Sequence, residues 1–390
     1  MYSEWHKSQE IGEALGVSAD TVRPILHDNN VYIRKSWEYS KKVNAIIIVM
    51  AKKASDYQDK ARGMLAGLAI GDALGAPYEF GYKSKDIVEL GDKISHFHAQ
   101  TKNFKLPKGA WTDDTSMALC IADSLLEKGG YDSYDMMDKF TKWFLYGYRS
   151  SVDHSVGIGR QTSLSLLTYA RHKTIPKDTR KTNRAGNDPI MRLAPIVIAS
   201  TKKDGGKPQF IDHLIQLAQL SCRETHDSYI AIAATTVFAG ALDYALHYGF
   251  VDEHILRYVP NLYPEDRNEY VERLLESTQR SNDRSGESLK DHGGYIVDTL
   301  TIALWGIQNH NNFKDGMLAV IRLGGDTDTN TACYGQLAGA LYGYEAIPEE
   351  WRDGVHLSNE LVDIADRLLN MDECPIIRTR FEDDSHFMAL

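Results

Sequence analysis

The sequence contains few cysteines, and their spacing builds neither a metal site nor a disulfide framework. The 390 residues hold four of them, and none forms a CxxC pair or a close cluster: Cys120, Cys222, Cys333 and Cys374. Zinc sites and disulfide-rich secreted domains use closely spaced or paired cysteines. The pattern therefore favours buried or surface thiols in a reducing compartment, and we expect the protein to be cytoplasmic.

The chain also lacks a membrane-spanning run, a secretion signal and an excess of positive charge. The apolar run AIIIVM (Ala45–Met50) is far shorter than the ~20 residues that cross a bilayer. The N-terminal stretch MYSEWHKSQE has neither the basic start nor the apolar core of a signal peptide. The formal net charge of -10 provides no global attraction to nucleic acid or to anionic lipid. We expect a soluble protein without a membrane partner.

Several common catalytic motifs are absent from the sequence. There is no G-x-S-x-G nucleophile elbow, no H-E-x-x-H zinc motif and no Walker phosphate loop. The stretch GIGRQTS (Gly157–Ser163) does not match G-x-G-x-x-G. No repeat of about 20–50 residues, the period of solenoid proteins, is present. These absences argue against a serine hydrolase, a zinc protease, a P-loop enzyme and a solenoid.

Apolar residues recur with helical spacing over most of the chain after residue 50. Segments such as DTSMALCIADSLLEK and IVDTLTIALWGIQN place them at i, i+3 and i+4 rather than in alternation. Many of these residues are Ala or Gly, whose small size lets helices approach closely. Candidate strands are few, namely Asn30–Tyr39 and Asn44–Met50. The sequence therefore predicts an all-α fold, a compact multi-helix globule over residues 51–390.

Residues 1–50 differ from the rest and are predicted to form a separate small extension. Ser8–Leu26 has the rhythm of a helix-turn-helix, in which Ser18 caps the second helix. Such a module would bind DNA through Arg23 and its neighbours. However, Pro24 falls inside the would-be recognition helix, and the extension carries as many acidic as basic residues. Contact with nucleic acid, binding of a protein partner and a vestigial extension all remain open.

Two clusters combine acidic and hydroxyl side chains, and each precedes an apolar helix. The first lies in GAWTDDTSMALC and the second in GGDTDTNTACYG; their members are Thr112, Asp113, Asp114, Thr115, Asp326, Asp328, Thr329 and Asn330. Capping of helix N-termini explains one such cluster. Capping needs only one acceptor, however, and adjacent acids add repulsion that a divalent cation would remove. Carboxylate and hydroxyl oxygens suit magnesium, manganese or calcium rather than zinc.

The second cluster matches the start of an EF-hand but lacks two of its required residues. In DTDTNT and its continuation the sixth position is Thr331 instead of Gly, and the twelfth is Leu337 instead of Glu. We therefore expect the two clusters to converge and to hold two cations, ~3.5–4 Å apart as in other two-metal sites. The segment GLAIGDALGAPYEF adds Asp72 and Glu79. These two acids either join the site, or brace a helix end and lie on the surface.

The order of these motifs resembles that of the ADP-ribosylglycohydrolases, of the dinitrogenase-reductase-activating glycohydrolase type. The resemblance covers Ala61–Asp353 and rests on GMLAGLAIGDALGAPYEF, WTDDTSMAL, GIGRQT, GNDPIMRLAPI, ETHDSYIAIAA, GYIVDTLTIALW and LGGDTDTNTACYGQLAGALYG. It implies an all-α fold with a binuclear magnesium or manganese site. The metal ligands that it implies are Thr112, Asp113, Asp114, Asp326, Asp328 and Thr329.

The resemblance also implies roles for residues around the cations. Glu79 matches a glutamate implicated in catalysis or in gating substrate entry, and it joins two of the ligands as the implied catalytic set: Glu79, Asp113 and Asp326. The loop with Gly157 and Gly159 matches a diphosphate-facing loop. Asn187 matches the asparagine of an N-G-x-x-M-R element, and His226, next to Thr225, matches a residue near the ADP moiety.

This sequence departs from the family pattern at two of these places. Asp188 stands where the N-G-x-x-M-R element has its glycine, and Pro189 follows it. Some relatives have an aspartate that helps catalysis at the position of Gly157, and Asp153 is only a weak substitute for it. The first departure concerns the local backbone and the rim of the substrate pocket, and the second concerns catalysis.

The resemblance implies a metal-dependent hydrolase that removes ADP-ribose from a modified acceptor. Arginine-linked ADP-ribose on a protein is the expected substrate, whereas serine, a nucleic-acid base or a small ADP-ribosyl conjugate remain open as acceptors. A second hypothesis is a protein that binds ADP-ribose without hydrolysing it, or a toxin-immunity protein, which acts partly by binding through residues 1–50. A third is a regulator brought to DNA by that extension. The intact ligand set favours the enzyme, because loss of an Asp or Thr would mark an inactive relative.

Overall fold

The computed structural model describes the chain with gaps, and for residues 36–55 and 208–210 it describes the backbone alone. The described residues are 36–100, 105–174, 185–200, 208–249, 251, 274, 276 and 279–379. The chain divides into two compact units, Met1–Asp56 and Tyr57–Leu390. The predicted boundary after residue 50 falls inside the helix α3 (Ser36–Gly75). The helix-turn-helix pattern of residues 8–26 lies outside the described residues.

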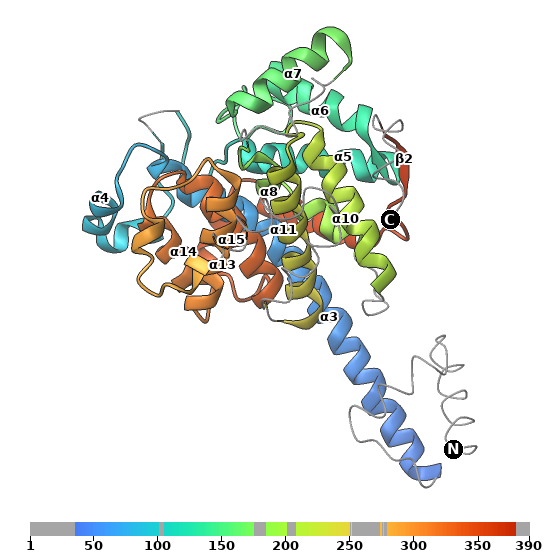
Figure 1. Cartoon of the computed structure of the whole chain (residues 1–390). Helices are drawn as coiled ribbons and strands as arrows, with labels where there is room; N and C mark the ends of the chain where they lie inside the picture. Colours follow the sequence, from blue (N-terminus) through green and yellow to red (C-terminus); the bar gives the residue numbers. More distant parts are fainter. Residues whose placement is uncertain are drawn as a thin grey trace. The chain divides into compact units, whose positions relative to one another are not determined.

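Helices make up most of the described part of the unit Tyr57–Leu390 (Figure 1). In chain order the elements are α3 (Ser36–Gly75), η1 (Ala76–Tyr78), α4 (Ser84–Glu89), η2 (Gly91–Ser95), α5 (Asp113–Lys128), β1 (Tyr131–Asp132), α6 (Ser133–Tyr146), α7 (Arg160–His172), α8 (Asp188–Met191), α9 (Ala194–Ser200), α10 (Pro208–Arg223), α11 (Tyr229–Tyr248), η5 (Arg280–Asn282), η6 (Glu287–Leu289), α13 (Ile296–Asn309), α14 (Phe313–Leu323), α15 (Thr327–Tyr342), α16 (Glu349–Gly354), α17 (Ser358–Leu369) and β2 (Ile376–Arg378). The prediction of a mostly helical fold is confirmed.

The strands differ from the prediction. Asn44–Met50 lies within α3 and is helical, so its assignment as a candidate strand was wrong. A short apolar run has no periodicity that separates a strand from a buried helix. Conversely, β1 and β2 pair in parallel, although each is only two or three residues long. Strands this short carry no alternating pattern that the sequence could reveal.

The helices α3 and α15 touch backbone to backbone through small residues. A Cβ atom at Gly67 would lie 2.2 Å from the carbonyl oxygen of Gly335, and one at Gly71 would lie 2.1 Å from that of Thr331. Residues four apart lie on one helix face, so these glycines form a continuous contact surface. The surface ends at Gly75, where an added Cβ would lie 2.5 Å from the Cα of Asp328. The contact therefore brings α3 directly to the start of α15.

Replacing Gly67 tests this contact. We expect Gly67→Ala to lower the free energy of unfolding by about 1–3 kcal/mol, because the added methyl group must push two helix backbones apart. Urea denaturation followed by circular dichroism measures the change. Ser163→Ala, on the partly exposed face of α7, is the control and should stay within about 0.5 kcal/mol of the parent. An unchanged midpoint for Gly67→Ala would contradict the close approach.

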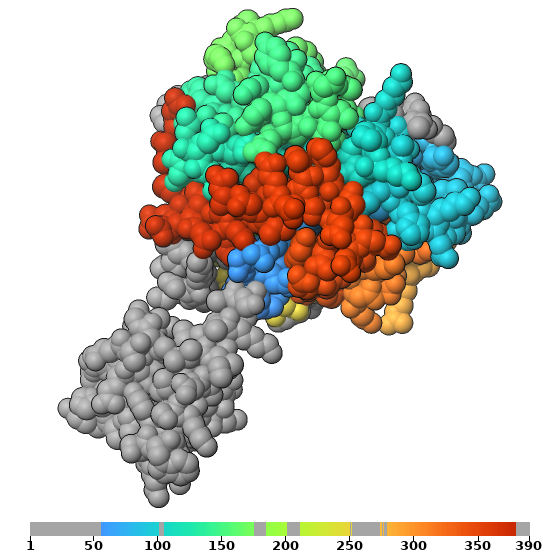
Figure 2. All heavy atoms as spheres, turned by 180° about the vertical axis from the view of Figure 1, so that it is seen from behind, coloured from blue at the N-terminus to red at the C-terminus, as the bar shows by residue number. Residues whose placement is uncertain are grey.

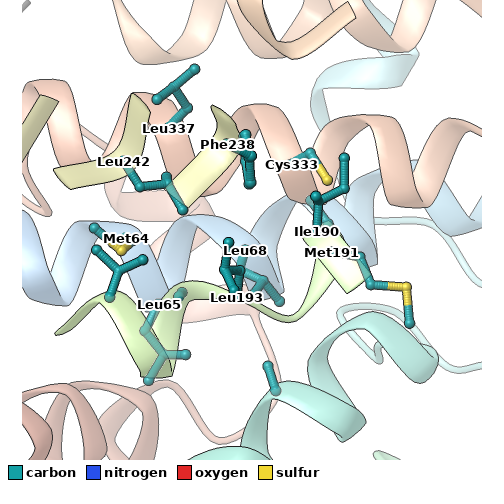
Figure 3. Packing of buried hydrophobic residues seen from close by; sticks show 14 of the residues in the cluster. Met64, Leu65, Leu68, Ile190, Met191, Leu193, Phe238, Leu242, Cys333 and Leu337 are labelled. Atoms are coloured by element: carbon teal, nitrogen blue, oxygen red, sulfur yellow. The ribbon is translucent and has the colours of Figure 1, made fainter. Parts of the chain in front are cut away.

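The hydrophobic core lies where α3, α8, α11 and α15 meet. Leu68, Ile190, Phe238 and Leu337 come from these four helices, are all buried, and lie together in Figure 3. All four cysteines are buried and unbridged, as predicted, and Cys333 belongs to this core. The core supports the end of α3 and the start of α15, the two places where the acidic segments begin.

Helix α11 is, among the described helices, the one that is long and apolar enough to cross a membrane by length and composition. It has 20 residues, and 83% of its most apolar window is buried inside the protein. It packs against α10, α13 and α15. Its apolar character is therefore explained by its central place in the core, and it is weak evidence for a membrane span.

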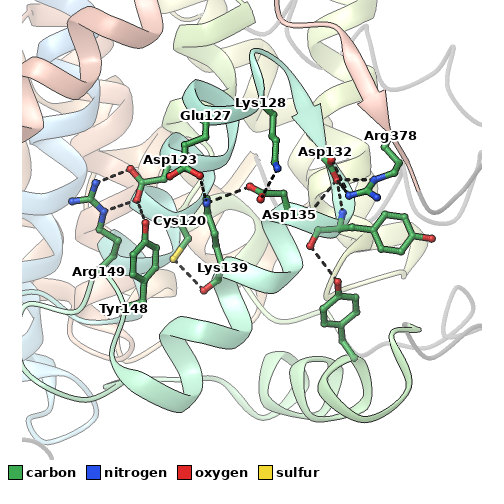
Figure 4. A network of polar contacts seen from close by, with 12 residues as sticks. Cys120, Asp123, Glu127, Lys128, Asp132, Asp135, Lys139, Tyr148, Arg149 and Arg378 are labelled. Carbon is green, nitrogen blue, oxygen red and sulfur yellow. Dashed lines mark hydrogen bonds and ion pairs between the residues drawn. The ribbon is translucent and has the colours of Figure 1, made fainter.

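Polar networks fasten the outer helices to this core. Arg149 donates to both carboxylate oxygens of Asp123 in α5 at 2.6 Å and also pairs with Glu360 of α17 (Figure 4 shows the Asp123 contacts). On the same side of α5, Lys139 bridges Glu127 and Asp135. These contacts hold α5 in a fixed position, and α5 begins at the first acidic cluster.

The last helices cover one face of the folded unit. In Figure 2 they form an orange-red band between the green segments of α6 and α7 and the cyan segments around α4 and η2. The Trp351 Nε1–H of α16 donates to the carbonyl oxygen of Ser95 at 2.7 Å. Arg62 of α3 forms a bidentate pair with Asp366 of α17 at 2.6 and 2.7 Å. The C-terminal helices thus tie early and late parts of the chain together.

Candidate metal centre

The two acidic clusters meet in space, as the sequence predicts. Asp113 and Asp114 stand in the first turn of α5, and Asp326 and Asp328 stand at the start of α15. All four carboxylates are buried, although acidic side chains are rarely buried without a partner. The close contact of α3 with α15 adds acids from a third segment.

Two groups of carboxylates form at this junction, and they share one residue. Asp72, Asp114 and Asp328 each offer an oxygen within 4.8 Å of the others, and so do Glu79, Asp326 and Asp328. Asp328 belongs to both groups and joins them. Asp72 and Glu79 therefore lie at the acidic centre. Of the two alternatives that the sequence left open for these acids, the structure supports the one in which they join the clusters. The carboxylate of Asp113 belongs to neither group.

Asp72 also caps the helix that carries the first cluster. Its carboxylate accepts hydrogen bonds from the backbone N–H groups of Thr112 and Thr115, at 2.9 and 3.0 Å, and from both threonine hydroxyls. The orphan N–H groups of the first turn of α5 are thus satisfied from α3. Thr112 Oγ1 also lies 3.1 Å from Asp114 Oδ2, so Thr112 links Asp72 to Asp114.

The second group is held by residues from α8 and from the loop before α13. The Asn187 side-chain amide donates to Asp326 Oδ2 at 2.7 Å. The backbone N–H of Asp326 donates to the carbonyl oxygen of His292 at 3.3 Å. A Cβ atom at Gly293, whose φ is +137°, would lie 2.3 Å from the Cβ of Asp326. Glycine is therefore required at this approach. Thr329 is buried in the first turn of α15, beside these groups.

The electrostatics of the centre oppose its ionisation. Burial, and then the charge of Asp326, raise the pKa of Glu79 from 4.5 to about 8. Burial raises the pKa of Asp72 to about 6, although hydrogen bonds from α5 act against it. Burial and neighbouring carboxylates hold the pKa of both Asp114 and Asp328 well above the usual range. Several negative charges in one buried site carry a cost that either protonation or a nearby positive charge removes.

The residues present fit a divalent cation in both groups. Among the described residues, no lysine or arginine forms an ion pair with Asp114, Asp326 or Asp328. The buried oxygen Oδ1 of Asp114 has no hydrogen-bond partner among the described residues, which suits a metal ligand. The donors are carboxylate and hydroxyl oxygens, the ligands that hard cations prefer. The arrangement is compatible with a metal site.

Comparison with known proteins places the chain in a family. The sequence profile described as ADP-ribosylglycohydrolase matches residues 53–375. The chain belongs to the ADP-ribosylglycohydrolase family. One relative, the ADP-ribosylarginine hydrolase Tri1 of Pseudomonas putida, is 33% identical over 312 residues, which cover 80% of this chain and 78% of that protein.

Two further comparisons define the family and the fold. The ADP-ribosyl-[dinitrogen reductase] glycohydrolase of Rhodospirillum rubrum is 29% identical over 296 residues, 75% of this chain and 89% of that protein. A solved structure, an ADP-ribosylglycohydrolase-related protein complex, has a TM-score of 0.59 and 34% identity, and covers 81% of this chain and 99% of that chain. The family resemblance is confirmed. The arginine hydrolase is more similar than the dinitrogen-reductase type that the motifs suggested.

The glycine loop of this ADP-ribosylglycohydrolase packs against the acidic centre. A Cβ atom at Gly157, whose φ is +91°, would lie 2.2 Å from Asp113 Oδ1. No side chain fits there while Asp113 keeps this position, so the aspartate found in some relatives has no room. The side chain of Asp153 is 97% exposed and pairs with His154. It points to solvent, so it does not replace the missing aspartate.

Asp188, which sequence reasoning treated only as a departure from the family pattern, is a further buried acid of the centre. Burial, and then the charge of Asp188, raise the pKa of Asp113. Asp188 Oδ2 lies 3.5 Å from His226 Nε2, and Thr162 of α7 donates to its other oxygen. An added Cβ at Gly159 would lie 2.9 Å from Asp188 Oδ1. Asp188 thus joins α8 to the glycine loop. The sequence signal that could have identified Asp188 as part of the centre was its position directly after Asn187.

His226 is fully enclosed and neutral. It is 1% exposed, and burial lowers the pKa of its imidazole to about 4. Its Nδ1 lies 2.9 Å from Thr225 Oγ1, which accepts a hydrogen bond from the buried Arg192 at 2.7 Å. The structure therefore places this predicted residue in a buried position beside Asp188.

These pKa shifts predict how the stability of the metal-free protein depends on pH. A carboxyl with a raised folded-state pKa keeps its proton to higher pH in the folded than in the unfolded chain. Stability is therefore present below pH ~4.5, the unfolded pKa of Glu79, and is lost as the pH rises to about 8. We expect the melting temperature of EDTA-treated protein to fall between pH 5 and pH 8 because of this cluster.

Divalent cations should reverse this trend. We expect Mg²⁺ or Mn²⁺ to raise the melting temperature, and to raise it more at pH 8 than at pH 5, because the cations neutralise the ionised cluster. Differential scanning fluorimetry measures both series, and potassium at equal ionic strength is the control for screening. A melting temperature that divalent cations leave unchanged at pH 8 would contradict the metal assignment.

Proposed function

We propose that this ADP-ribosylglycohydrolase removes ADP-ribose from modified arginine side chains, with two divalent cations, Mg²⁺ or Mn²⁺, in its acidic centre. The observation that supports this most strongly is the pair of buried carboxylate groups that share Asp328. One such group is compatible with one cation, and a shared carboxylate is compatible with two neighbouring ones. The alternative of a folded relative without a metal site leaves these buried acids unexplained.

The proposed ligands come from three segments of the chain. Asp72, Asp114 and Asp328 would hold one cation and Glu79, Asp326 and Asp328 the other, with the hydroxyls of Thr112 and Thr329 beside them. The carboxylate of Asp113 would complete the set predicted from the sequence. Bound cations would supply Lewis-acid polarisation and orientation of the ribose hydroxyl groups.

Glu79 is the residue to which we assign proton transfer. Among the carboxylates of the two groups it is the partly exposed one, whereas the others are buried. Water and the substrate therefore reach Glu79 first. In the proposed reaction a water oxygen bonds to C1′ of the ribose as the bond from C1′ to the guanidinium nitrogen breaks. A proton of that water passes to the Glu79 carboxylate, and Glu79 then returns this proton to the departing nitrogen, so the carboxylate is regenerated.

The charges around the centre favour a cationic acceptor. Asp113 and Asp188 lie outside the two groups, and each is buried. They lie close enough for the charge of Asp188 to raise the pKa of Asp113. A guanidinium group would relieve this repulsion, because its positive charge lies on N–H donors whose planar arrangement matches the oxygens of a carboxylate. The Tri1 relative is named as an ADP-ribosylarginine hydrolase, which supports the same acceptor.

The remaining substrate contacts follow from the loop beside Asp113. Gly157 and Gly159 lead into α7, whose N-terminus has no side-chain cap. The first backbone N–H groups of a helix favour an anion. We propose that this loop faces the diphosphate of ADP-ribose. Asn187 would act by holding Asp326, to which its side-chain amide donates a hydrogen bond. His226 would act through its position beside Asp188, since its Nε2 lies 3.5 Å from Asp188 Oδ2.

A hydrolysis panel tests the proposed function. ADP-ribosyl-arginine, ADP-ribosyl-serine and ADP-ribosylated nucleic acid are each incubated with the protein in Mg²⁺, Mn²⁺ or EDTA. We expect free ADP-ribose from the arginine conjugate with either cation and none in EDTA. Binding of the arginine conjugate without turnover in any cation would overturn the enzyme assignment and support an ADP-ribose-binding protein instead.

A further inference from the structure

A cavity lies outside the acidic centre, and it is lined in part by the end of α14, shortly before Asp326. Its volume is about 570 Å³, and it lies between α4, the loop before α13, the end of α13 and the end of α14. The cavity is large enough for a small molecule, because small-molecule sites occupy ~300–1,000 Å³. None of the ligands proposed above for the acidic centre lines it.

The wall of this cavity is basic. Arg284, Lys290 and Arg322 line it, and none of its lining residues is acidic. The whole chain has 54 acidic and 44 basic residues. A cavity lined by three basic side chains and no acidic one therefore differs from the protein as a whole, which is negatively charged. This local positive charge indicates a site for an anion.

The two guanidinium groups of this wall are available to a ligand. Among the described residues, neither Arg284 nor Arg322 has an ion-pair or hydrogen-bond partner for its side chain. By contrast Arg62, Arg149 and Arg280 each pair with a carboxylate. A guanidinium presents a rigid fork of N–H donors that matches phosphate and carboxylate oxygens in pairs.

The acids near the cavity in sequence are already engaged. Asp283 accepts hydrogen bonds from Ser285, through the backbone N–H at 3.0 Å and through the hydroxyl. Asp291 accepts from the backbone N–H of Ser84 at 2.8 Å. Glu287 pairs with Lys290, and its side chain is 68% exposed. Among the described residues, none of these three acids forms an ion pair with Arg284 or Arg322.

The wall is rigid because three segments are tied together behind it. The Ser84 hydroxyl donates to the carbonyl oxygen of Arg322 at 2.6 Å, and the Asp291 backbone N–H donates to that of Leu323 at 2.8 Å. Trp305 Nε1–H donates to the carbonyl oxygen of Asp283 at 2.8 Å and fixes the opposite loop. A preformed wall lowers the entropy that a ligand must lose on binding.

We propose that this cavity binds a phosphate group, carried by inorganic phosphate or by a small phosphomonoester. A phosphomonoester carries a charge of about -1.5 to -2 at pH 7 and has three acceptor oxygens, which matches a wall of several cations. Gln308 and Asn311 also line the cavity, and their side-chain amides are hydrogen-bond donors. The site goes beyond the proposed hydrolysis and does not depend on it.

Calorimetric titration of the full-length protein tests the site. Inorganic phosphate and phenyl phosphate are titrated at constant ionic strength, in Mg²⁺ and in EDTA. We expect saturable binding of one equivalent in both media, and affinity reduced ~10-fold or more by Arg284→Ala and by Arg322→Gln. If phenyl phosphate binds more tightly than inorganic phosphate, the ligand is a phosphomonoester. If the two bind equally, the ligand is free phosphate.

The controls separate this site from its alternatives. Arg171→Ala, at an exposed arginine of α7 outside the cavity, should leave the affinity unchanged. Arg284 is on an exposed loop, so its variant stays folded even if Arg322→Gln, checked by circular dichroism, does not. Unchanged affinity in Arg284→Ala, binding that appears only with Mg²⁺, or no saturable binding would each overturn the proposal.

Discussion

Asp328→Asn is expected to abolish hydrolysis of ADP-ribosyl-arginine while the protein stays folded. Asp328 belongs to both carboxylate groups, so its loss would weaken both cation sites at once. Metal ions contribute several kcal/mol to transition-state stabilisation, so we expect the turnover number to fall by ~10³-fold or more. Release of ADP-ribose under saturating substrate measures the loss, and calorimetric titration with Mn²⁺ measures the cation affinity.

A simple folding defect would give a different result. Asn removes a negative charge from a buried cluster of acids, so the EDTA-treated variant should melt at or above the parent at pH 8. Asp326→Ala is expected to lose both metal binding and hydrolysis in the same way. Asp153→Asn, whose side chain is exposed, is the matched control and should keep full activity. Wild-type turnover in Asp328→Asn would contradict the proposed centre.

Glu79→Gln is expected to lower turnover strongly while substrate binding persists. Glu79 is the partly exposed member of the two groups and is assigned the proton transfer. Loss of a positioned acid or base typically costs ~10²–10⁴-fold in rate. The expected change is in kcat, with KM altered little, because Gln keeps the shape of the side chain. Steady-state kinetics with the arginine conjugate separates the two parameters.

The control for Glu79 is the cation affinity. The group of Asp72, Asp114 and Asp328 is intact in Glu79→Gln, so at least one Mn²⁺ equivalent should still bind. This distinguishes the variant from Asp328→Asn, in which both groups lose a ligand. A raised KM with unchanged kcat would instead assign Glu79 to substrate entry, and it would remove the glutamate from the proton-transfer step.

Several features of this protein could be predicted from the sequence because they depend on local chemistry. Apolar residues at helical spacing predict the helices around Asp113 and Asp328, and the glycines and alanines predict their close packing. The acid-hydroxyl clusters stand where helices begin, so the sequence also predicts where the centre would form. The order of motifs identifies the family, which the profile match over residues 53–375 confirms.

Other features depend on which segments meet, and no local pattern contains that information. The backbone contact of α3 with α15 places Asp72 against α5 and gives Asp328 its position in both carboxylate groups. The burial of Asp188 beside His226, and the cationic cavity at Arg284 and Arg322, arise from chain segments far apart in sequence. The sequence by itself determined the mostly helical fold, the two acid-hydroxyl clusters and the family. The tertiary structure alone decided which acids share a site, because the cost of burying like charges depends on distances that only packing sets.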